Sequence, residues 1–134
     1  MKKVWIIPCS GIGKTYGSVA RESAFMVTED LCPEQTGIMA LSRLVPSGHD
    51  DRFEIHDADC ITIDGCKLAC AAKVVAATGG NLICALQVLD VYRAHPELKP
   101  AGITELNEGG QKLARVIAYK IAAVVEGMEV KQNA

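Results

Sequence analysis

Residues 3–8, Lys3-Val4-Trp5-Ile6-Ile7-Pro8, form the stretch that decides the fold. This nearly continuous apolar run is typical of a strand that is buried on both faces of a parallel sheet. A glycine-rich loop follows directly over residues 9–17. Apolar residues then recur at helical spacing from Ala20 to Leu31, which predicts a helix over residues 18–31 with Ser18 as its N-cap. A strand that leads through a short loop into a helix is the beginning of an α/β fold.

The remainder of the chain continues this alternation. Further strands are predicted over residues 58–64 and 82–89, and further helices over residues 36–44, 65–80 and 111–126. Residues 48–59 are acidic and are predicted to be irregular. The last helix has its core stripe at Leu113, Ile117, Ile121 and Val124. We therefore expect an α/β fold over residues 1–134: a small single-domain sandwich with a mainly parallel sheet flanked by helices.

Composition limits the classes of function. The chain has 134 residues, which is enough for one domain to bury a core without disulfides. Its net charge of −2, without a block of basic residues, gives no indication of nucleic-acid binding. No apolar run approaches the roughly 18 residues that a membrane helix needs. The apolar run at residues 4–7 is also too short for a secretion signal, so we expect a cytoplasmic protein.

Six cysteines in such a chain point to metal binding or thiol chemistry before disulfides. Cys9 follows the first predicted strand and Cys66 follows the second, and parallel strands present their carboxyl ends at one edge of the sheet. Cys66 and Cys70 stand four positions apart, which would make them neighbours on one face of a helix. The predicted core stripe of that helix, on roughly the opposite side, is Leu68, Ala72, Val75 and Ala76.

The other polar groups of this region have secondary roles in the prediction. Lys73 shares the cysteine face of the helix and Asp64 ends the second strand, so both are candidates for the surroundings of the site. Cys60 and Cys84 lie inside predicted strands, where a free cysteine packs as a small apolar residue. No catalytic residue can be assigned from these patterns.

The glycine-rich loop resembles a phosphate-binding loop, G-x-x-x-x-G-K-[ST], between a strand and a helix. Backbone amides and a lysine would hold an anion at the helix N-terminus, which makes Gly11, Gly13, Lys14 and Thr15 a candidate site for a small anionic ligand. Pro8 stands where that motif has its first glycine, and proline has no amide hydrogen to donate. An anion- or nucleotide-binding module is therefore an alternative function of the chain.

Three segments together resemble the DGC-domain family of small prokaryotic zinc-binding proteins. They are Pro8–Glu22, Leu31-Cys32-Pro33, and Ile63-Asp64-Gly65-Cys66 with Cys70–Lys73. The resemblance spans most of the chain and implies four chelating cysteines, which are here Cys9, Cys32, Cys66 and Cys70. It implies no particular reaction.

The leading hypothesis is a zinc-binding protein that uses these four cysteines. Four thiolates complete a tetrahedral, structural zinc site, whereas three leave a position for water or substrate. An iron–sulfur cluster on the same cysteines is the alternative cofactor. The alternative function is a thiol-dependent redox or transfer enzyme, with Cys66 as nucleophile and Cys9 or Cys70 as resolving thiol. Whether the chain is an enzyme is left open, and a homo-oligomer is compatible with the sequence.

Overall fold

A computed structural model of the protein describes residues 3–9, 14–44, 55–65 and 68–133. Its strands are β1 (Val4–Pro8), β2 (Thr36–Ile38), β3 (Asp59–Asp64) and β4 (Asn81–Gln87). Its helices are α1 (Thr15–Phe25), α3 (Cys70–Ala77), α4 (Val88–Ala94) and α5 (Glu108–Asn133), with a π-helical turn η1 (Met26–Leu31) that continues α1 and a 3-10 turn η2 (Leu41–Leu44). Strands and helices alternate, so the predicted α/β fold is confirmed.

The strands form one parallel sheet in the order β2-β1-β3-β4. From β1 the chain passes through α1 to β2 on one side, and from β3 it passes through α3 to β4 on the other side. The winding direction therefore reverses between β1 and β3. In open α/β sheets, ligands bind outside the carboxyl ends of the strands at such a reversal.

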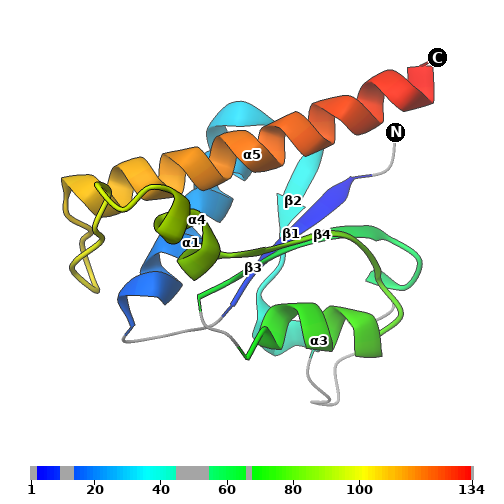
Figure 1. Cartoon of the computed structure of the whole chain (residues 1–134). Helices are drawn as coiled ribbons and strands as arrows, with labels where there is room; N and C mark the ends of the chain where they lie inside the picture. The colour runs from blue at the N-terminus through cyan, green and yellow to red at the C-terminus, as the bar shows by residue number, and fades with distance from the viewer. Residues whose placement is uncertain (1–2, 10–13, 45–54, 66–67, 134) are drawn as a thin grey trace.

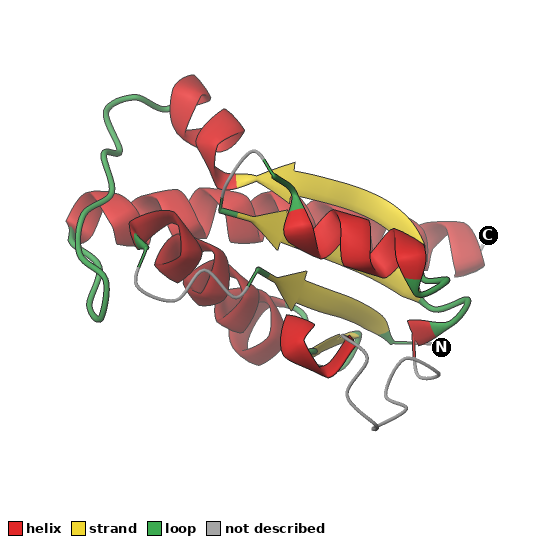
Figure 2. Ribbon diagram, turned by 90° about the horizontal axis from the view of Figure 1, so that it is seen from below, coloured by secondary structure: helices red, strands yellow, loops and turns green. Residues whose placement is uncertain are grey.

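Helices cover both faces of the sheet (Figures 1 and 2). Helices α1 and α5 pack together on one face, and α3 packs on β3 and β4 from the other. Because β1 and β3 are central strands covered on both sides, their isoleucines are fully buried: Ile6, Ile7, Ile61 and Ile63. The α5 stripe is confirmed at Leu113, Ile117 and Ile121, whereas its next fully buried position is Val125 rather than the predicted Val124.

The helix predicted over residues 36–44 is wrong. Residues Thr36–Ile38 form β2, which pairs with β1 so that Thr36 lies opposite Val4. Only residues Leu41–Leu44 of this segment are helical, as a single 3-10 turn. A strand of three residues is too short to show a period, so the pairing with β1 decides its conformation. Most of the predicted irregular segment, residues 48–59, lies outside the described residues.

Helix α3 begins later than the sequence predicts. Its first residue is Cys70, and Ala69 before it has a left-handed backbone with φ of 51°. Of the two cysteines predicted to share a helical face, Cys70 is the first residue of α3, and Cys66 lies outside the described residues. The core side of α3 consists of Ala71 and Val75, while Leu68 is 66 % exposed.

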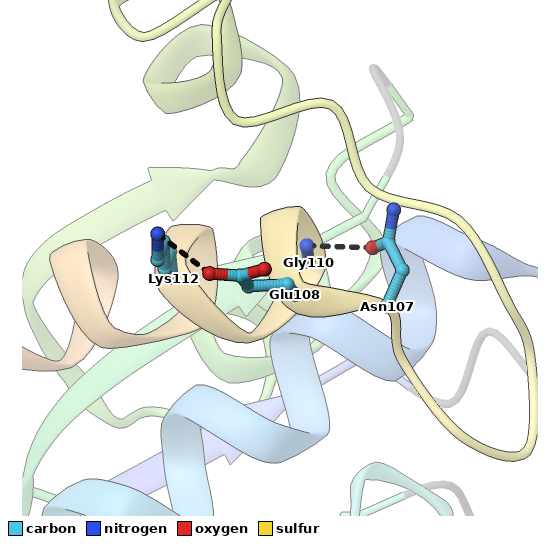
Figure 3. A network of polar contacts seen from close by, with 4 residues as sticks. All are labelled: Asn107, Glu108, Gly110 and Lys112. Atoms are coloured by element: carbon cyan, nitrogen blue, oxygen red, sulfur yellow. Dashed lines mark hydrogen bonds and ion pairs between the residues drawn. The ribbon is translucent and has the colours of Figure 1, made fainter.

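Helix α5 is longer than predicted at both ends, and the Asn107 side chain caps its start. The Asn107 Oδ1 accepts hydrogen bonds from the backbone N–H of Gly110 at 2.7 Å and of Ala101 at 3.0 Å. Figure 3 shows this cap beside the Glu108–Lys112 ion pair of 2.9 Å, which lowers the pKa of the Glu108 carboxyl. Within the described ranges, no helix has the length and apolar character needed to cross a membrane.

Candidate functional site

Cys9 directly follows β1, at the point where the winding direction of the sheet reverses, and it is hydrogen-bonded to the end of β3. Its backbone N–H donates to the Ile63 carbonyl at 2.9 Å, which continues the β1–β3 pairing by one residue. Its Sγ accepts a hydrogen bond from the Gly65 N–H at 3.1 Å, and the side chain is buried. The fold thus fixes the Cys9 sulfur against the residue that follows β3.

Gly65 permits this arrangement because the start of α1 passes immediately beside it. A Cβ at this position would lie 2.9 Å from the Gly17 nitrogen and 3.0 Å from the Tyr16 carbonyl carbon. The first distance is shorter than real Cβ contacts and the second is tighter than most of them, and both neighbours are backbone atoms of a helix. The absence of a side chain at Gly65 therefore lets β1, β3 and α1 meet at one point.

Asp64 connects the end of β3 to the start of α3. Its carboxylate oxygens accept hydrogen bonds from the N–H of Ala71 at 2.8 Å and of Ala72 at 3.2 Å, and the residue is 1 % exposed. Helix N-terminal amides have no partner within the helix and carry partial positive charge, so a buried carboxylate is stable there. Asp64 thereby holds the first residue of α3, Cys70, at the same end of the sheet as Cys9.

Cys70 and Lys73 are exposed to solvent, whereas Cys9 is buried. Both side chains are exposed, and they stand three residues apart on α3, which makes them neighbours on the helix surface. Both carboxylate oxygens of Asp64 are engaged by α3, so its observed role is to position this helix. The placement of Asp64 and Lys73 in the surroundings of a metal stays a prediction.

Cys32 lies at the opposite end of β1 from Cys9. Its carbonyl accepts hydrogen bonds from the Thr36 N–H at 3.1 Å and from the Thr36 hydroxyl at 2.6 Å. Thr36 begins β2 opposite Val4, the first residue of β1. About 16 Å of extended strand separates Val4 from Cys9. Sulfurs on one zinc ion lie within about 4 Å of each other, so this conformation does not bring Cys32 to an ion held by Cys9.

The fourth predicted ligand, Cys66, lies outside the described residues. Among the residues that the structure does describe, no group of three or more His, Cys, Asp or Glu side chains is arranged to hold a metal ion. The described part of the site therefore consists of Cys9, Cys70 and the backbone and carboxylate groups that fix them.

Cys60 and Cys84 belong to the packing of β3 and β4, as predicted. Cys60 is fully buried, and its burial, together with the nearby Asp59 carboxylate, raises the pKa of the Cys60 thiol to about 11. Burial also raises the pKa of Cys84. Both shifts favour the neutral thiol, which is neither a good metal ligand nor a good nucleophile.

The glycine-rich loop has the predicted context of strand, loop and helix. Helix α1 begins at Thr15, and Lys14 is its exposed N-cap residue, without a capping side-chain hydrogen bond. Gly11 and Gly13 lie outside the described residues. Anion binding by this loop stays a prediction.

Sequence reasoning missed two contacts that build the site. Both belong to the segment Asp64-Gly65, in which the carboxylate caps α3 and the amide donates to Cys9. An Asp-Gly pair at the end of a strand and shortly before a helix is the only signal that the sequence offered. The partners of both groups are tertiary, so their identity could not be deduced from spacing.

Comparison with protein families gives one match. The sequence matches the DGC domain over residues 5–108, which includes all of β1 but its first residue, the candidate site and the loop before α5. No curated protein and no solved structure matches the chain.

Proposed function

The chain belongs to the DGC domain family, and we propose that it binds zinc at the carboxyl ends of β1 and β3. In this proposal Cys9, Cys66 and Cys70 supply the thiolates. Cys66 immediately follows Gly65 in the sequence, and the Gly65 amide donates to the Cys9 sulfur at 3.1 Å. That hydrogen bond is the observation that carries the proposal, because it keeps Cys9 beside the segment that bears the other two cysteines.

The surroundings of Cys9 and Cys70 suit thiolate ligands. Metal ligands need neighbouring groups that fix their orientation, and N–H donors to a coordinated sulfur are one such group. The Gly65 amide has this role for Cys9, and Asp64 fixes the α3 end that carries Cys70. When bound by three thiolates, zinc supplies a fourth, open position at which a water or substrate oxygen is polarised.

Cys32 distinguishes this three-cysteine proposal from the four-cysteine set that the family resemblance implies. Its distance from Cys9, about the length of β1, argues that it stabilises the fold rather than the metal. Its side chain is buried at the junction of η1 and β2. A four-thiolate site would require this junction to move to the other end of the sheet.

Elemental analysis of single cysteine-to-serine variants, purified without oxygen, tests the proposal. We expect about one zinc per chain in the unmodified protein, and a loss of most of it in C9S, C66S and C70S. C32S and C84S should retain it, with C84S as the matched control because Cys84 is only half-buried on the edge strand. Circular dichroism of each variant separates metal loss from unfolding. Loss of zinc from folded C32S would reinstate the four-cysteine site, and an unmodified protein without metal would refute zinc binding.

The exposure of Cys70 supports a second candidate, a thiol-dependent redox or transfer enzyme. An exposed thiol at the start of a helix is accessible to reagents and lies at the positive end of the helix dipole. Iodoacetamide distinguishes the two functions. A zinc-bound Cys70 should react slowly until a chelator is added, whereas a free catalytic thiol should react at the same rate with and without the chelator.

A further inference from the structure

A pocket of about 330 Å³ lies on the flank of α1, away from the sheet. One wall is the α1 surface around Ser18, Arg21 and Phe25, and the other is the segment 103–106 that leads into α5. Pockets of this size, at the lower end of the range for ligand sites, admit small molecules. None of the described cysteines lines it, so it is separate from the described part of the proposed metal site.

One hydrogen bond joins the two walls, and two others hold the segment that forms the second wall. The Ser18 hydroxyl donates to the Ile103 carbonyl at 2.5 Å and ties the segment to α1. The Gln111 side chain donates to the Leu106 carbonyl at 3.1 Å, and Asn107 anchors the same segment through the Lys99 carbonyl. The pocket is therefore a built feature of the fold, and its shape does not depend on a single loose side chain.

Arg21 carries a positive charge in this pocket, and it forms no ion pair within the part of the chain that the structure describes. Its Nη2 donates to the Ser18 hydroxyl at 3.1 Å. Its Nη1 is covered by protein atoms and has no acceptor among the described residues, and none of their carboxylates forms an ion pair with it. A partly buried charge without a partner is unfavourable, so an external anion would stabilise it.

The remaining charges of the pocket select the kind of anion. Glu22 and Glu105 also line it, both exposed, which gives one positive and two negative charges. This balance disfavours a doubly charged ligand such as phosphate, because each added negative charge is repelled by the glutamates. It favours a molecule with one carboxylate and one ammonium group. Phe25 and Ile103, which are 42 % and 50 % exposed, add apolar surface for a side chain.

We propose that this pocket binds a free α-amino acid with an apolar side chain. The ligand carboxylate pairs with the Arg21 guanidinium, whose fork of N–H groups suits bidentate binding. The ammonium group lies near Glu22 and Glu105, and the side chain contacts Phe25 and Ile103. Since Nη1 is covered in the free protein, bidentate pairing requires the atoms that cover it to move when the ligand binds.

Calorimetric titration of the unmodified protein tests the charge selection without any mutation. The ligands are L-leucine, L-methionine and L-phenylalanine, the leucine analogues 4-methylpentanoate (no ammonium group) and 3-methylbutylamine (no carboxylate), and inorganic phosphate as a multiply charged anion. We expect at least one amino acid to bind, and each leucine analogue that lacks a charge to bind about tenfold more weakly than leucine, since a hydrogen-bonded charge contributes this much. Absence of binding by all three amino acids refutes the proposal, as does phosphate or 4-methylpentanoate binding as tightly as leucine.

Substitution of Arg21 tests its role directly. Arg21→Gln should weaken amino-acid binding about tenfold or more, while Arg115→Gln, an exposed arginine outside the pocket, serves as the matched control and should leave it unchanged. Thermal melts verify that both variants fold. If Arg21→Gln does not fold, the double variant Glu22→Gln/Glu105→Gln tests the proposal instead. It removes both negative charges, so it should strengthen the binding of 4-methylpentanoate relative to that of leucine. Unchanged binding in folded Arg21→Gln, or an unchanged ratio in the double variant, overturns the proposal.

Discussion

Asp64→Ala should destabilise the protein strongly, although Asp64 lies outside the apolar core pattern. Its buried carboxylate accepts two backbone hydrogen bonds from the start of α3, at 2.8 and 3.2 Å. A hydrogen bond to a charged acceptor contributes about 1.5 kcal/mol net, so the loss of both costs about 3 kcal/mol. This is a large share of the roughly 5–15 kcal/mol by which a domain is stable. Asp64→Asn keeps one acceptor oxygen and should cost about half as much.

Urea denaturation followed by circular dichroism measures these changes in the free energy of unfolding. The matched control is Asp59→Ala on the same strand, because the Asp59 carboxylate makes one exposed hydrogen bond, to Asn81 at 2.8 Å. It should cost less than about 1 kcal/mol. If Asp64→Ala cost no more than Asp59→Ala, the inference that Asp64 anchors α3 would be refuted. The Asp64→Ala variant should also bind zinc more weakly, because Cys70 begins the helix that Asp64 holds.

Three further predictions concern other parts of the fold. The pKa of Cys60 in the folded protein is about 11, above the ordinary thiol value of 9.0. The protonated thiol therefore contributes stability below pH 9.0, and this contribution is lost as the pH rises toward 11. Cys60→Ala should make the decline of the unfolding free energy over this pH range less steep. Gly65→Ala should cost about 1–3 kcal/mol in urea denaturation, because the new Cβ would press on the α1 backbone; an unchanged midpoint would contradict the close approach. Asn107→Ala should lower the unfolding free energy by about 1–2 kcal/mol through the lost α5 cap, whereas Lys112→Ala, which removes only the exposed ion pair with Glu108, should have little effect.

The secondary structure was predictable wherever a long pattern carried it. The apolar run Val4–Pro8 identified β1, and the segment after Ala58 identified β3, because central strands of a parallel sheet bury both faces. The stripe of α5 was predictable from its helical spacing. The short strand β2 was missed, because its conformation depends on pairing with β1 and three residues contain no period.

The sequence alone determined the fold class, the two central strands and the position of Cys9 at a strand end. These features depend on the pattern of apolar residues within short stretches of sequence. Only the tertiary structure decided at which end of the sheet Cys32 and Cys70 lie. It places Cys32 at the far end of β1 and begins α3 at Cys70, since the register of β2 and the carboxylate of Asp64 fix those segments. It also places Arg21 in a pocket that Glu22 and Glu105 line as well, with no ion pair to it among the described residues. Contacts between residues as distant in sequence as Ser18 and Ile103 depend on how the helices pack, and no local pattern encodes that packing.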